Sequence, residues 1–145
     1  RASSLSARLH YLYNNRQYNN INITKTIIFM EKYQKLSTGD APRTELHDKL
    51  GLTGAEISIN RMPAGTAVPF VHSHKQNEEI YGILGGKGVM TLDGEKVELR
   101  EGDWLRVAPS VRRQMAAADD SQLTYICIQV KEGSLEQMTA ADAVI

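Results

Sequence analysis

The stretch VHSHKQNEEIYGILGG, from Val71 to Gly86, places two histidines and two glutamates directly ahead of an apolar run. His72 and His74 are separated by one residue. Because alternate side chains of an extended strand share a face, both imidazoles are expected to point the same way. Two imidazoles with a nearby carboxylate are suitable ligands for a first-row transition metal. The stretch therefore predicts a metal site on a strand face.

On both sides of this stretch the chain alternates between apolar and polar residues. Glu56–Met62 alternates as a half-buried strand does. Asp93-Gly94 lies between two alternating runs, which is a strong hairpin signal. We expect short strands, with turn residues between them, at residues 56–62, 68–74, 79–84, 89–92, 95–99, 103–107, 112–117 and 123–130. This pattern predicts an all-β domain, either a small barrel or a sandwich.

The spacing of residues 72–86 resembles the first signature of the cupins: glycine, five residues, His-x-His, three or four residues, glutamate, six residues, glycine. Glu79 fits the four-residue spacing and Glu78 the three-residue spacing. We prefer Glu79, because Gly86-Lys87-Gly88 then forms a turn after the strand. The resemblance implies a small antiparallel β-barrel, the double-stranded β-helix or jelly roll of the cupins, with a metal inside its mouth.

The second cupin signature is glycine, five residues, Pro-x-Gly, two residues, histidine, three residues, asparagine. Here six residues separate Gly102 from Pro109, and the glycine of the pattern is Val111. The histidine position then falls on Gln114. The amide of Gln114 offers a neutral carbonyl oxygen, which is a weaker ligand for zinc, nickel or iron than an imidazole.

The resemblance implies a divalent metal ion (zinc, iron, nickel or manganese) held by His72, His74 and Glu79, with Gln114 or water as the fourth ligand. Two histidines and a carboxylate form a facial triad that leaves positions free for a substrate or for oxygen. The alternative is a cupin that has lost its metal and keeps the two histidines as polar pocket lining.

Three further side chains are expected to line a ligand pocket. In an extended strand, Phe70 would share a face with His72, and Tyr81 would share a face with Glu79. Arg112 would likewise share a face with Gln114. Arg112 would then bind a carboxylate or phosphate inside the pocket. The next residue, Arg113, is expected to face away from it.

The composition fits one small domain without a strong charge. The chain has 145 residues, with 17 basic and 17 acidic side chains. Its formal net charge is zero, so no global field would recruit nucleic acid or a membrane. Its single cysteine, Cys127, cannot form an internal disulfide, which favours a reducing cytoplasm and a buried structural thiol. The resemblance also implies a homodimer.

The first residues differ from the rest of the chain in charge. Residues 1–29 carry four basic residues and no acid, so residues 30–145 have a net charge of −4. We expect residues 1–30 to be a non-native or flexible N-terminal arm, with Met30 as the native start, and residues 31–145 to be a single cupin domain. The alternative is a native arm that adds a strand to a partner subunit.

Two function classes follow from these residues. The first is an enzyme in which the metal polarises a substrate or binds oxygen, as in the metal-dependent dioxygenases, sugar isomerases and decarboxylases with this resemblance. Tyr81, or Glu79 where it does not bind the metal, is the nearby candidate for a general acid or base. The second class is a binding module that holds a small metabolite without turnover. The two retained histidines and the glutamate favour the enzyme, and the missing third histidine favours the binding module.

Overall fold

The computed structural model describes residues 32–137 and 142–144, and the predicted N-terminal arm lies outside them. The chain divides into two compact units, residues 1–35 and residues 36–145. All elements considered below belong to the second unit. Within the described residues, no helix is long and apolar enough to cross a membrane.

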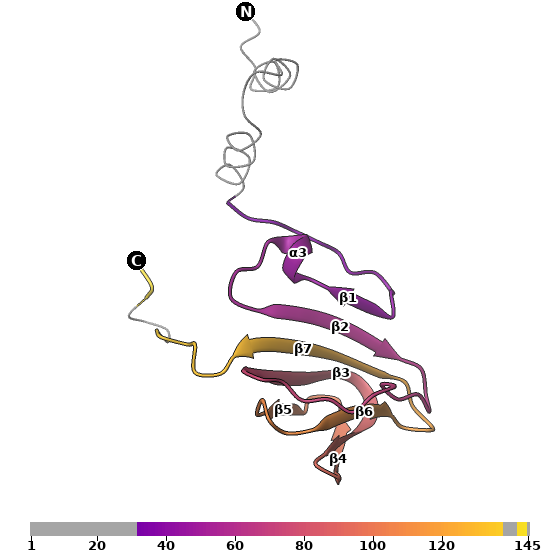
Figure 1. Cartoon of the computed structure of the whole chain (residues 1–145). Helices are drawn as coiled ribbons and strands as arrows, with labels where there is room; N and C mark the ends of the chain where they lie inside the picture. Colours follow the sequence, from indigo (N-terminus) through magenta and orange to yellow (C-terminus); the bar gives the residue numbers. More distant parts are fainter. Residues whose placement is uncertain (1–31, 138–141, 145) are drawn as a thin grey trace, which may run out of the picture. The chain divides into compact units, whose positions relative to one another are not determined.

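Two antiparallel sheets make up the second unit, and they share one long strand, β3 (Asn77–Leu92) (Figure 1). The first sheet consists of β1 (Arg43–Glu45), β2 (Glu56–Met62), β7 (Leu123–Lys131), the first half of β3, and β5 (Trp104–Val107). The second sheet consists of the second half of β3, β4 (Glu95–Arg100) and β6 (Arg113–Ala117).

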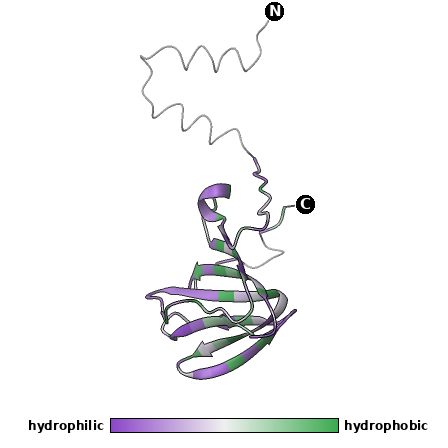
Figure 2. Cartoon of the chain, turned by 90° about the vertical axis from the view of Figure 1, so that its right-hand side faces the viewer, coloured by the Kyte–Doolittle hydropathy of each residue, from purple (hydrophilic) through white to green (hydrophobic). Residues whose placement is uncertain are grey.

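Side chains from both sheets meet in one core. Tyr81 and Tyr125 contribute from the first sheet, and Met90, Leu99 and Met115 from the second. The alternation of polar and apolar positions along the strands is visible as bands of colour in Figure 2. Within the described part of the chain, the sheets do not close into a continuous barrel. The predicted all-β fold is therefore confirmed, in its jelly-roll form.

The expected turn at Gly86-Lys87-Gly88 is absent. Residues 79–84 and 89–92 belong to one strand, β3, which pairs with β7 up to Gly86 and with β4 from Lys87 onward. A shift in register between Ile83 and Gly85 marks a β-bulge there. A bulge bends a strand and increases its twist without ending it. At Gly85 and Gly86, β3 thus passes from the first sheet to the second.

The strand expected over residues 68–74 is also not formed as a regular ladder. This segment runs beside β6 but makes only isolated bridges, Ala67 with Ala116 and His72 with Arg113. Pro69 lies between these bridges and has no backbone N–H, so it cannot contribute to continuous pairing. Conversely, residues 43–50, which show no clean alternation, form β1 and the short helix α3 (His47–Leu50).

Candidate metal centre

The site is built around Glu79, on the inner face of β3. The register places Gln129 of β7 on one side of Glu79 and Val107 of β5 on the other. Two residues further along the same face, Tyr81 lies beside Cys127. Because these neighbours come from three adjacent strands, the carboxylate is enclosed by the sheet, and Glu79 is only 5% exposed.

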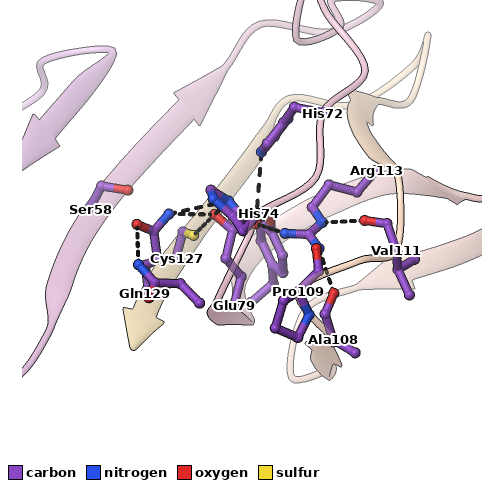
Figure 3. A network of polar contacts seen from close by, with 12 residues as sticks. Ser58, His72, His74, Glu79, Ala108, Pro109, Val111, Arg113, Cys127 and Gln129 are labelled. Carbon is purple, nitrogen blue, oxygen red and sulfur yellow. Dashed lines mark hydrogen bonds and ion pairs between the residues drawn. The ribbon is translucent and has the colours of Figure 1, made fainter. Parts of the chain in front are cut away.

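Both carboxylate oxygens of Glu79 accept hydrogen bonds (Figure 3). Oε2 accepts from the Tyr81 hydroxyl at 2.5 Å and from Nη1 of Arg113 at 2.8 Å. Oε1 accepts from Nε2 of Gln129 at 3.2 Å and from the Cys127 thiol at 3.5 Å. The side chain is therefore held in one orientation by groups from β3, β6 and β7.

These contacts determine the protonation of the site. Burial alone would raise the pKa of Glu79, but the hydrogen bonds from Tyr81, Arg113 and Gln129 outweigh it and hold the pKa at about 2. Burial raises the pKa of the Cys127 thiol to about 12, and the Glu79 charge adds to this. Burial likewise raises the pKa of Tyr81. At neutral pH Glu79 is ionised, whereas the phenol and the thiol keep their protons.

The two histidines approach Glu79 from the segment beside β6. Nε2 of His74 lies 3.2 Å from Oε1, and Nε2 of His72 lies 3.9 Å from Oε2. Backbone hydrogen bonds fix the segment: the N–H of His72 donates to the Arg113 carbonyl, and the N–H of His74 to the Pro109 carbonyl. The ring centroids are 5.2 Å apart. The irregular segment thus presents both imidazoles to one carboxylate.

The donor set fits a divalent first-row transition metal. One ligand atom from each of His72, His74 and Glu79 can be chosen so that all three lie within 4.8 Å of one another. Ligand atoms bound at about 2.1 Å to one ion and at right angles are about 3 Å apart. The distance of 3.2 Å from Nε2 of His74 to Oε1 is close to this value, and the distance of 3.9 Å from Nε2 of His72 to Oε2 is longer. Burial lowers the pKa of His72 and thus favours the neutral imidazole that a metal requires.

Two features of the histidines concern their orientation. Nδ1 of His72 is buried and has no hydrogen-bond partner among the residues that the structure describes, whereas a metal-binding histidine usually donates from its second nitrogen. The His72 ring instead packs in an edge contact against Phe70, with centroids 5.4 Å apart. The Gln129 amide lies 3.3 Å from Nε2 of His74. The position of His72 therefore depends on packing and on its backbone bonds.

Arg113 is the residue that the sequence pattern missed. It was expected to face away from the pocket, but it is 1% exposed and its guanidinium pairs with Glu79. Its remaining donors bond to the carbonyls of Val111, Ala108 and Pro109. The expectation was wrong because it took Gln114 as an inward position, whereas the buried residues of β6 are Arg113, Met115 and Ala117.

Gln114 lies apart from the cluster. Its amide nitrogen donates to the Val68 carbonyl at 2.8 Å, and its side chain does not line the cavity beside the histidines. A signal for Arg113 was present in the sequence. If Ala108 is aligned with the proline of the second cupin signature, five residues separate it from Gly102, as the signature requires. The histidine position of the signature then falls on Arg113. A cation thus occupies the place of the third imidazole.

The cluster opens into a cavity of about 700 Å³ on the inner face of the first sheet. Phe70 and Tyr81 are among the residues that line this cavity. Arg112 does not line it: its side chain is exposed. The wall formed by β2 adds two buried polar residues, Ser58 and Asn60. The cavity therefore combines the metal-ligand cluster with hydrogen-bonding groups for a small molecule.

Comparisons with known proteins agree with this architecture. A family model described as "Cupin domain" matches residues 58–129. The crystal structure of a cupin protein from Bacteroides fragilis is 64% identical, with a TM-score of 0.78, and the match covers 80% of this chain and 98% of that one. A structure described as a putative sugar phosphate isomerase, from Acidithiobacillus ferrooxidans, is 20% identical, with a TM-score of 0.54. The match covers 73% of this chain and 72% of that one, and it shows a similarity of fold alone.

Among curated proteins, an uncharacterised protein of Methanocaldococcus jannaschii is 36% identical over 66 residues. The match covers 46% of this chain and 52% of the archaeal protein, so the chain spans about half of that relative's length. The family match, the closely similar Bacteroides structure and the jelly roll with its His-His-Glu cluster lead to one conclusion: this chain belongs to the cupin superfamily.

Proposed function

We propose that this protein binds a divalent transition-metal ion through His72, His74 and Glu79, and a small-molecule ligand in the adjoining cavity. The observation that carries the proposal is the convergence of two imidazoles and one ionised carboxylate at the cavity wall. The three residues come from two separate segments, which the fold holds together through hydrogen bonds to β3 and β6. Such a set leaves coordination positions free for a ligand.

Within this centre the chain's own residues have distinct tasks. Oε2 of Glu79 accepts short hydrogen bonds from the Tyr81 hydroxyl and the Arg113 guanidinium. The hydrogen bonds to Oε1 are longer, so Oε1 is the oxygen that a metal would displace more readily from its partners. Tyr81 keeps its proton on the phenolic oxygen, and Gln129 steadies Oε1. A bound metal ion would supply Lewis-acid polarisation or an oxygen-binding centre. The proposed reaction classes are oxygenation and sugar isomerisation.

Arg113 also suggests the charge of the ligand. The Arg113 guanidinium is cationic, whereas the family signature has a neutral histidine at this position. A metal-loaded centre here would therefore carry one more positive charge than a centre with three histidines. In a partly enclosed cavity this charge favours an anionic partner over a neutral one. We therefore propose that the ligand carries a carboxylate or a phosphate, which the metal and not Arg112 would bind.

The test is metal binding by the full chain, first as purified and then after chelator treatment and titration with Zn²⁺, Fe²⁺, Ni²⁺ or Mn²⁺. Wild-type protein is expected to bind about one equivalent of metal, as a single three-ligand site does. The double variant His72→Ala/His74→Ala is expected to bind none at the same concentrations, because one carboxylate alone is a weak site for these ions. Equilibrium dialysis with elemental analysis measures both.

His47→Ala is the matched control, because it removes an exposed histidine that belongs to α3 and not to the cluster. It should bind metal as the wild type does. Circular dichroism checks that the double variant keeps its sheets. Undiminished metal content in the folded double variant would contradict the assigned site.

A second candidate function is a metal-free, metabolite-binding cupin, and Arg113 is the observation that favours it. Its guanidinium already balances the Glu79 charge at 2.8 Å, so the site needs no metal for neutrality. This candidate predicts negligible metal uptake by the wild type. It also predicts that Arg113→His, which removes the cation and offers a third imidazole, restores uptake. Uptake by the wild type itself would rule this candidate out.

A further inference from the structure

The cavity wall formed by β2 and β7 carries polar side chains that are almost fully buried. Ser58 and Asn60 of β2 are 2% and 4% exposed, and Tyr125 of β7 is 5% exposed. All three line the cavity, to which Val68 and Phe70 contribute apolar surface from the segment that carries the histidines. Buried polar groups are costly unless their hydrogen bonds are satisfied, so the bonds of these residues decide what this wall can bind.

The strand register places this wall within reach of the metal ligands. Ser58 is paired with Cys127, whose thiol contacts Glu79. Figure 3 shows the Ser58 side chain extending from β2 toward that side of the site. Because β7 lies between β2 and β3, Ser58 and Glu79 are two strand spacings, about 10 Å, apart across the sheet. One small molecule can therefore span the distance from the candidate metal centre to Ser58.

The orientation of the Asn60 amide is fixed by Arg43. Nη1 of Arg43 donates to Oδ1 of Asn60 at 2.8 Å, and Nδ2 of Asn60 donates to Oγ of Ser58 at 3.0 Å. A guanidinium has donors only, so the amide oxygen must face Arg43 and the amide nitrogen must face Ser58. The opposite orientation would set two donors against each other at the Arg43 contact.

This orientation determines where the Ser58 proton points. Oγ of Ser58 accepts from the amide, so its own O–H must be directed away from Asn60. No side chain or carbonyl in the described part of the chain accepts that hydrogen bond, although Ser58 is only 2% exposed. The Tyr125 hydroxyl likewise makes no hydrogen bond to the described residues, and it lines the same cavity. The wall thus offers unused donors to a ligand.

The charge beside Ser58 and Asn60 is balanced within the chain. Nε and Nη2 of Arg43 lie 3.0 Å and 2.9 Å from Oε1 of Glu45, and Nη1 is bonded to Asn60. The Arg43 cation is therefore offset and its donors are committed. An anionic group at Ser58 would lose its hydration without gaining a free counter-charge, whereas an uncharged oxygen needs only a donor.

We propose that Ser58 is a specificity-determining residue, whose hydroxyl donates a hydrogen bond to an uncharged keto or hydroxyl oxygen of the ligand. This inference rests on the proposed function, which places the anionic group of the same ligand at the metal. The ligand class is then a small carboxylate or phosphate that carries a keto or hydroxyl group several bonds away from its charge. A site built to hydrogen-bond such an oxygen discriminates against an analogue that lacks it.

The test is an NMR titration of the zinc-loaded full chain with matched pairs of carboxylates. The first pair is levulinate, a keto acid, and pentanoate, which has a methylene in place of the keto group. The next two longer homologous pairs cover other distances from the metal. A keto oxygen can only accept, so it reports on the Ser58 donor alone. Wild-type protein is expected to bind the keto acid of at least one pair about three- to tenfold more tightly, the effect of one hydrogen bond to an uncharged group.

Two variants remove the donor in different ways. Ser58→Ala deletes the hydroxyl, and the preference for the keto acid is expected to be lost or reversed. Asn60→Asp keeps Ser58 but replaces the amide nitrogen with a carboxylate oxygen, which accepts the Ser58 proton and turns it away from the cavity. The same loss of preference is expected. Thr66→Val is the matched control, because Thr66 lines the cavity but its hydroxyl already donates to the Pro63 carbonyl at 2.7 Å.

The outcomes separate this inference from the proposed function. Equal wild-type affinities within every pair would overturn the role of Ser58 and leave the metal and anion site standing. So would a preference that survives in folded Ser58→Ala and Asn60→Asp, or one that is lost as fully in Thr66→Val. A wild-type chain that takes up no zinc, or binds neither member of any pair, would instead contradict the proposed function and this inference with it. Circular dichroism checks the fold of each variant.

Discussion

Replacing Arg113 with methionine is expected to lower the free energy of unfolding of metal-free protein by about 3–5 kcal/mol, the cost of breaking a buried ion pair from one side. The Glu79 carboxylate is 5% exposed, and Arg113 is its cationic partner, 2.8 Å away. Methionine has a similar length but no charge and no donors. The variant would also leave the carbonyls of Ala108 and Pro109 without their guanidinium donor. Urea unfolding with EDTA present measures the loss.

A double variant separates the ion pair from packing. Glu79→Gln/Arg113→Met removes both charges, so no ion is left buried without a partner. It is expected to be more stable than Arg113→Met alone, with a coupling of about 1–3 kcal/mol between the two sites. If Arg113→Met costs less than about 1 kcal/mol, the guanidinium does not stabilise the Glu79 charge and the description of the site above is wrong.

The substitution Gly86→Ala is expected to destabilise the fold by at least about 3 kcal/mol, because it combines backbone strain with a steric clash. Gly86 has φ of 81°, a conformation that residues with a Cβ rarely adopt. An added Cβ would lie 1.7 Å from the backbone carbonyl oxygen of Gln122, which cannot move aside as a side chain can. The damage falls where β3 passes between the sheets, so both sheets are affected.

The neighbouring residue supplies the control. Gly85 has no atom within 4 Å of an added Cβ and no positive φ, so Gly85→Ala should change the free energy of unfolding by less than about 1 kcal/mol. Chemical denaturation of the two variants side by side makes the comparison. Equal losses would mean that the bulge does not require the close approach of Gly86 to Gln122.

Some features of this protein follow from the sequence alone, because they depend on neighbours along the chain. The alternation of Glu56–Met62 predicted β2 with its exact bounds. Asp93-Gly94 predicted the hairpin between β3 and β4, and both residues have the positive φ that this turn requires. The spacing from His72 to Gly86 predicted the cupin fold, which the comparisons confirm.

Other features were decided only by the tertiary structure. Counting alternate residues works within a regular strand and fails across a bulge, a proline or a corner. For this reason the continuity of β3 through Gly86 and the irregular pairing around Pro69 could not be read from the pattern.

The same limit applies to the candidate centre. The sequence pattern selected His72, His74 and Glu79, and the fold brings these three together. The spacing counted from Pro109 selected Gln114, one residue away from Arg113. Only the fold supplies the partners that hold the Arg113 guanidinium, a carboxylate 34 residues away and three backbone carbonyls at the corner before β6. A long charged side chain takes the direction in which its charge is satisfied, and only the folded chain supplies those partners.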